Sequence, residues 1–172
     1  MSLNSPIKAQ LIAQNGGETI EFMFNPTQLD FSRSLQLNSS EGARTGTGIP
    51  KISFAYPEPY SLSIGNIIFD TYETGANVVD AHISKFRAAV AFLPSAARPP
   101  IYLFTWGSQE YLRCFVKSLR YKLTMFLADG TPVRAVVDLT LEEIDATTTT
   151  PGMSASNSSS QRTRDTRQQR SR

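Results

Sequence analysis

The sequence contains one cysteine and one histidine in 172 residues, and this scarcity excludes several classes of protein. A single cysteine, Cys114, cannot form an intrachain disulfide, which excludes a small secreted fold held together by disulfides. A single histidine, His82, has too few histidine and cysteine companions for a zinc site. No serine and aspartate stand in a recognisable catalytic-triad context. We therefore expect no metal, no cofactor and no enzymatic activity.

The sequence also lacks long hydrophobic runs. None approaches the roughly 18–20 apolar residues that a membrane-spanning helix needs. The first ten residues, MSLNSPIKAQ, do not combine a charged segment with an apolar stretch as a signal peptide does. We therefore expect a chain that is made in the cytoplasm and does not insert into a membrane.

Net positive charge is found only at the end of the chain. Residues 161–172 hold five arginines and one aspartate, a formal charge of +4, so the first 160 residues carry −2 of the overall +2. Residues 147–172 contain one large apolar residue, Met153, and cannot offset the entropy of ordering themselves. The sequence therefore predicts one domain over 1–146, for which its 40% hydrophobic content suffices, and an extended Ser/Thr/Arg-rich tail over 147–172.

Apolar and polar residues alternate through most of the domain, which is typical of antiparallel strands with one buried face. One helix is predicted over 78–92, capped by Asn77, and the Gly- and Ser-rich residues 38–50 favour a flexible loop. We predict a mainly β fold, an antiparallel β-barrel or sandwich of about seven strands with one packed helix. The expected strand segments are 6–14, 18–26, 29–38, 51–56, 60–73, 101–107, 111–126 and 133–144.

Two further segments can be interpreted as catalytic groups, but each has a more ordinary structural interpretation. Asp70, followed by Thr71 and Glu73, could be a carboxylate beside a general base, yet an Asp-Thr pair before a helix more often closes a turn. Cys114 has no histidine nearby in sequence, and a packed thiol is the stronger interpretation. His82 is expected to have a structural or surface role.

Four stretches in collinear order resemble one family. They are FMFNPTQLDFSRS, LSIGNIIFDTYETGANV, RPPIYLFTWG and YKLTMFLADGTPVRAVVDLTLEE. Together they resemble the tube-type baseplate adaptor proteins of contractile injection systems, which are phage-tail-like particles. The resemblance covers about residues 5–145. It implies a ring of six copies that continues the inner tube and joins it to the spike within the baseplate. Family members often carry a LysM domain behind the tube-like domain, and here the tail stands in its place.

The final predicted hairpin fits such a ring. Its strands, 111–126 and 133–144, are joined by a turn at Asp129-Gly130, and an arm of about twelve residues reaches roughly 40 Å at 3.3 Å per residue. Edges this long need a partner, and a neighbouring copy in a ring supplies one. The expected inter-subunit residues are Tyr121, Leu123, Met125, Val133, Ala135, Val137 and Leu139.

The tail arginines are expected to dock on an acidic groove of surrounding baseplate wedge or sheath proteins, because the planar guanidinium binds carboxylates in bidentate fashion. These arginines are Arg162, Arg164, Arg167, Arg170 and Arg172. Two alternatives stay open: an inner-tube protein that polymerises into the shaft, and a nucleic-acid-binding β-barrel. The tail lacks the interleaved aromatic residues with which single strands are stacked, so nucleic acid is the less favoured partner.

Overall fold

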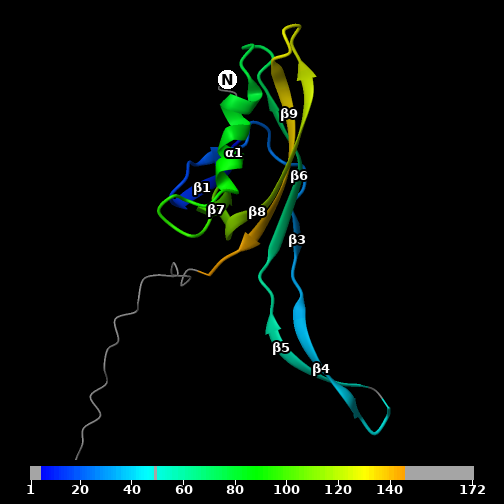
Figure 1. The fold of residues 1–172 in the computed structure, drawn as a ribbon. Helices are drawn as coiled ribbons and strands as arrows, with labels where there is room; N and C mark the ends of the chain where they lie inside the picture. The colour runs from blue at the N-terminus through cyan, green and yellow to red at the C-terminus, as the bar shows by residue number, and fades with distance from the viewer. Residues whose placement is uncertain (1–4, 49, 146–172) are drawn as a thin grey trace, which may run out of the picture.

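The computed structural model describes residues 5–48 and 50–145, and the fold is mainly β as predicted. Seven antiparallel strands form one sheet in the order β2-β1-β7-β8-β9-β6-β3, which curls into a half-barrel (Figure 1). Its strands are β1 (Ala9–Asn15), β2 (Ile20–Glu21), β3 (Asp30–Ser32), β6 (Ser61–Asp70), β7 (Ile101–Trp106), β8 (Gln109–Phe126) and β9 (Pro132–Glu143).

The predicted helix is present and packs on the half-barrel, but it is shorter than expected. It begins as one π-helical turn, η1 (Val79–Ile83), and continues as α1 (Ser84–Ala89). The backbone N–H of Val79 donates to Oδ1 of Asn77 at 2.9 Å, so Asn77 satisfies an orphan donor at the helix start as predicted. The helix ends at Ala89, where the chain tightens into a turn in which the N–H of Ala91 donates to the carbonyl of Ala88 at 3.2 Å. Pro94 restricts the backbone of Leu93 and so prevents the helix from continuing beyond that point.

The core lies between this helix and the sheet, and aromatic side chains dominate its centre. Phe86 from α1 is fully buried, with its ring centroid 5.5 Å from that of Phe69 and 6.3 Å from that of Phe22. Phe22 in turn lies 6.1 Å from Phe104 on β7. These four rings link β6, β7, the segment directly after β2 and the helix, so the aromatic cluster holds the helix against the curved sheet.

The second predicted strand, 18–26, is wrong in length. The structure keeps only Ile20–Glu21 as β2, and Phe24 is 51% exposed although it shares the alternation of Ile20 and Phe22. Asn25 explains the early end. Its Oδ1 accepts from the N–H of Ala9 at 2.9 Å and its Nδ2 donates to the carbonyl of Ile7 at 2.8 Å. A side chain thus takes over the hydrogen bonds that a longer strand would make.

The prediction of a flexible loop over 38–50 is also wrong. Two strands, β4 (Leu35–Arg44) and β5 (Pro50–Pro57), form a separate two-stranded sheet that projects from the half-barrel as a long hairpin (Figure 1). The ladder continues through Asn38↔Ser53 and Ser39↔Ile52 before a turn at residues 45–48. Composition alone predicted a loop there. Strand β4 has few residues that favour a strand in its second half, but it forms one because it pairs with the β-branched and aromatic residues of β5.

The aromatic core gives a first prediction. Phe86→Ala should lower the free energy of unfolding by about 3–5 kcal/mol, because it leaves a cavity between the helix and Phe22 and Phe69. Urea unfolding followed by circular dichroism measures this. Phe54→Ala on β5 is the matched control, since Phe54 is 80% exposed and its loss should change stability by less than about 0.5 kcal/mol. Equal losses in the two variants would contradict this description of the core.

Candidate assembly surfaces

The β8–β9 hairpin is the longest paired element of the described chain. It runs from the pair Cys114↔Glu143 to the pair Phe126↔Pro132. The turn predicted at Asp129-Gly130 is confirmed: Oδ1 of Asp129 accepts from the N–H of Thr131 at 2.9 Å, and Gly130 has a φ of +86°. Glycine adopts this left-handed conformation without the steric cost that a Cβ would bring.

One edge of this hairpin is free. Strand β7 pairs with β8 only along Gln109–Cys114, because β7 begins at Ile101, directly after Pro99 and Pro100, which have no N–H to donate. From residue 115 to 126, β8 therefore has β9 on one side and, among the described residues, no strand on the other. Where β7 is missing the sheet consists of β8, β9, β6 and β3, and its outer strands are β8 and β3. A row of backbone N–H and C=O groups is thus unpaired at the β8 edge.

The predicted inter-subunit residues divide into two groups. Those on β9 are buried in the core of their own chain, each at most 2% exposed: Val133, Ala135, Val137 and Leu139. Those on β8 are more accessible: Tyr121 is 37% exposed, and Leu123 and Met125 are half-buried. A role for this set between subunits stays a prediction. What the hairpin can offer a neighbour is the backbone edge of β8 and its three partly exposed side chains.

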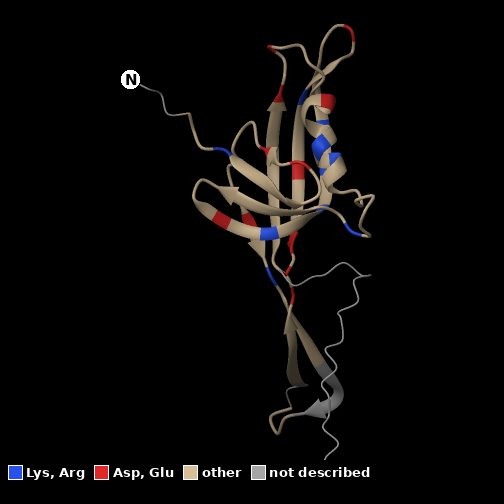
Figure 2. Ribbon diagram, turned by 90° about the vertical axis from the view of Figure 1, so that its left-hand side faces the viewer, with Lys and Arg blue, Asp and Glu red and all other residues tan. Residues whose placement is uncertain are grey.

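The β4–β5 hairpin carries an exposed apolar surface that the sequence analysis missed. Leu37 lies directly opposite Phe54, and Ile52 precedes Phe54 by two residues on β5 and lies on the same face. Their exposed fractions are 49%, 80% and 54%. The parts of this hairpin whose side chains are described carry no charge (Figure 2). The alternation of Leu35 and Leu37 indicated a strand, but the glycines and serines that follow concealed how far that strand extends.

The outer face of the β6-β9-β8 sheet, which points away from the core, is polar and carries both signs of charge. Nε and Nη2 of Arg134 donate to Oδ2 of Asp70 at 2.8 and 2.5 Å, and Lys117 pairs with Glu142. A hydrogen bond from the N–H of Tyr72, and then the Arg134 guanidinium, lower the pKa of Asp70. This face is therefore built to stay hydrated rather than to be buried in a core.

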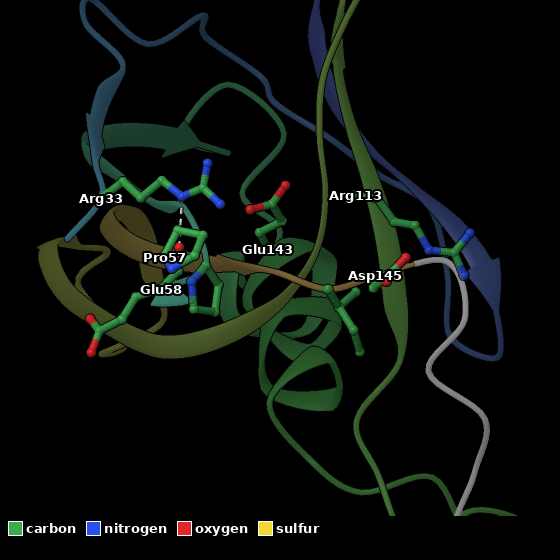
Figure 3. A pocket seen from close by; sticks show the side chains of 8 residues that line it. Arg33, Pro57, Glu58, Arg113, Glu143 and Asp145 are labelled. Atoms are coloured by element: carbon green, nitrogen blue, oxygen red, sulfur yellow. Dashed lines mark hydrogen bonds between the residues drawn. The ribbon is translucent and has the colours of Figure 1, made fainter. Parts of the chain in front are cut away.

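A charged cleft of about 600 Å³ lies at the base of the β4–β5 hairpin (Figure 3). Nε of Arg33 donates to the carbonyl of Glu58 at 2.7 Å, and its guanidinium lies 4.6 Å from the Tyr60 ring centroid. The carboxylate of Glu143 accepts from the N–H of Tyr60 at 2.9 Å. These contacts tie the hairpin's base to the half-barrel and so fix the direction in which the hairpin projects.

The side chains considered as catalytic groups have structural surroundings. Asp70 accepts from the N–H of Tyr72 and the hydroxyl of Thr71 donates to the carbonyl of Ala76, which confirms that this pair closes a turn. The His82 ring lies 5.0 Å from Phe69, and burial, followed by the charge of Lys85, lowers its pKa. Cys114 is fully buried, and burial raises the pKa of its thiol to about 12.

Two kinds of site have no candidate in the described part of the chain. Within residues 5–48 and 50–145, no three histidine, cysteine, aspartate or glutamate side chains gather as a metal site would require. No helix among those residues has the length and apolarity to cross a membrane. The predicted tail residues lie outside the described residues: Arg162, Arg164, Arg167, Arg170 and Arg172.

A half-barrel with a free β edge among the described strands and a projecting apolar hairpin is typical of a subunit that assembles with other chains. The family comparison agrees with this class. The family model for contractile injection system tube proteins matches residues 6–151, and the chain belongs to that family. Its role is structural, within a contractile injection particle that it forms with other components. No curated protein matches the sequence.

The surroundings of Cys114 give a second prediction. The thiol should not react with a disulfide reagent such as dithionitrobenzoate at pH 8 in the folded chain, because it is buried and protonated. It should react fully in denaturant. The absorbance of the released thiolate measures both states, and fast reaction of the folded chain would show that Cys114 is exposed.

Proposed function

We propose that this chain is a baseplate subunit that forms a ring joining the spike to the inner tube of a contractile injection particle. The observation that carries the proposal is the pair of sheet edges, β8 on one side and β3 with β4 on the other. Family membership supplies the context of the particle. The ring is the simplest assembly that gives every copy a partner at both edges.

The edges are complementary in kind. The free part of β8 offers N–H and C=O groups along residues 115–126, while β3 pairs with β6 only at Ser61–Ser63 and continues into β4, whose outer edge is also free among the described residues. Strand addition from one copy to the next would satisfy these groups. Because the sheet is already curved, each added copy would be rotated relative to the copy before it. Repeated contacts of this kind favour a closed ring over a flat ribbon.

In such a ring, the outer face of the β6-β9-β8 sheet would line the central channel. The channel wall would then carry the Arg134–Asp70 and Lys117–Glu142 pairs. Because most of these charges are balanced within one copy, a passing molecule would meet a hydrated wall with weak net attraction. The helix and the aromatic core would lie on the side away from the axis.

The β4–β5 hairpin would extend the contact to an adjacent copy or ring. A two-stranded hairpin is marginally stable at best in water, and this one exposes Leu37, Ile52 and Phe54. Burial of these side chains against a partner would stabilise both the hairpin and the assembly. The cleft residues at its base hold the hairpin in the direction that such docking requires.

The alternative from the same family is a tube subunit that polymerises into the shaft. The family match supports both roles, because it identifies tube proteins in general. Residues 161–172, with five arginines, favour the baseplate, since such a tail on every ring of a shaft would crowd the gap between tube and sheath. A nucleic-acid-binding barrel is less supported, because the polar sheet face would present Asp70, Asp138 and Glu142 to phosphates.

A charge on the hairpin's apolar face tests the ring. Phe54→Asp should abolish or strongly weaken ring formation, because it would place a carboxylate in the apolar contact, while the thermal unfolding of the single copy should not change. Negative-stain electron microscopy and sedimentation velocity measure the assembly.

Ser53→Asp is the matched control, because Ser53 is the next residue on β5 and points to the other face. Rings that persist in Phe54→Asp as in the control would refute the hairpin contact. A wild-type chain that remains a monomer in the presence of its spike and tube partners would refute the ring. Open-ended tubes formed by the chain alone would favour the shaft alternative.

Removal of the tail tests its docking role. A chain truncated after Ala146 should keep its circular dichroism spectrum and unfolding midpoint but reduce the yield of assembled baseplates. The reason is that the arginines beyond this point would no longer reach the surrounding proteins. Raising the salt concentration should weaken assembly of the full chain in the same way, because ions screen exposed charges. An unchanged particle yield after truncation would contradict the proposal.

A further inference from the structure

Over residues 115–126 of β8, where β7 is missing, the outer face of the β6-β9-β8 sheet carries four cationic side chains, and three of them face an acidic partner. Arg134 binds Asp70 and Lys117 binds Glu142. Arg120 lies directly opposite Asp138 in the β8–β9 register. The fourth, Lys122, lies opposite Val136 instead, so it is the one cation of the four with no acidic partner. Among the described residues no ion pair or hydrogen bond engages the side chain of Lys122 or that of Arg120, and Oδ1 of Asp138 accepts from the N–H of Asn66 at 2.9 Å. The register thus leaves one lysine without an acidic residue across from it.

Lys122 belongs to a row of three residues that lie opposite one another on β6, β9 and β8, and the other two residues of this row are apolar. Val136 pairs with Lys122 on one side and with Ile68 of β6 on the other, so the three side chains stand side by side. Ile68 is 40% exposed and Val136 is half-buried, although both lie on the polar face. The neighbouring rows contain Arg134 with Asp70 and Arg120 with Asp138. This row alone combines exposed apolar surface with an uncompensated cation.

We infer that the row Ile68–Val136–Lys122 is a binding site for an acidic polypeptide segment held in the channel of the ring. The inference rests on the proposed function, because the row faces a channel only if the copies close into a ring. The ammonium group of Lys122 binds a carboxylate of the segment, and the apolar part of the segment packs on Ile68 and Val136. Repetition around the ring gives one such site per copy and so raises the overall affinity.

Charge and shape both favour a polypeptide over a nucleic acid at this site. A phosphate backbone carries a charge at every nucleotide and would meet the carboxylates of Asp70 and Asp138 in the two adjacent rows. The row also has no aromatic side chain on which a base could stack. A peptide can place a single carboxylate at Lys122 and keep its neighbouring side chains neutral or apolar.

The test uses rings of the full-length chain and a short fluorescein-labelled peptide that carries one glutamate between neutral and apolar residues, with binding followed by fluorescence anisotropy. Lys122→Gln should weaken binding by about two- to fivefold for each copy that the peptide reaches, because every such copy loses one ion pair with the peptide. Lys122→Arg should bind as the unchanged chain does. Lys117→Gln is the matched control, since it removes the same charge from a lysine of the same strand that is already paired with Glu142.

Each outcome decides the inference. A loss confined to Lys122→Gln, together with weaker binding of an oligothymidylate, supports it. Equal losses in Lys122→Gln and Lys117→Gln would show an effect of net charge alone and overturn it, as would tighter binding of the oligothymidylate. Rings that form normally but bind no peptide overturn the inference and leave the proposed function standing. A chain that forms no ring in electron micrographs overturns both.

Discussion

The structure depends on an imbalance in strand length. Strand β8 spans Gln109–Phe126, whereas its neighbour β7 spans only Ile101–Trp106, so residues 115–126 of β8 have no partner on one side among the described strands. Backbone hydrogen-bonding groups are obligatory, and a regular row of them is a template for another strand. In the proposed ring a neighbouring copy would satisfy that row. The contact would then also account for the curl of the sheet, the direction of the β4–β5 hairpin and the polarity of the outer face.

The two faces of the sheet perform separate tasks. On the inner face Phe22, Phe69, Phe86 and Phe104 hold the helix against the strands, which gives one copy a core that does not need its neighbours. On the outer face the ion pairs keep the sheet hydrated. A subunit built in this way can fold alone and still expose a large polar wall, and this combination suits a component that is made first and assembled later.

Much of this fold could be predicted where the signal is local. Alternation in β9 identified Val133, Ala135, Val137 and Leu139 as one face, and Asp129-Gly130 and Asn77 identified a turn and a helix start. Non-local pairing set the remainder. Asn25 shortens β2 through bonds to Ile7 and Ala9, β5 carries residues 38–44 into a ladder, and Asp70 meets Arg134 across 64 positions. The isolation of Lys122 is likewise visible only in the register, because its neighbours in sequence do not reveal that Val136 lies opposite.

The β4–β5 hairpin has a consequence for the timing of growth. Its ladder pairs with no other described strand, and its side chains Leu37, Ile52 and Phe54 are exposed in the single copy. In the proposed ring these side chains would be buried against a neighbour, and an isolated two-stranded hairpin gains stability from such a contact. A copy that joins an existing ring would meet a surface that is already held in place, whereas two free copies would have to bring two projecting hairpins together. Under the proposal, addition to a seed would therefore be faster than the start of a new ring.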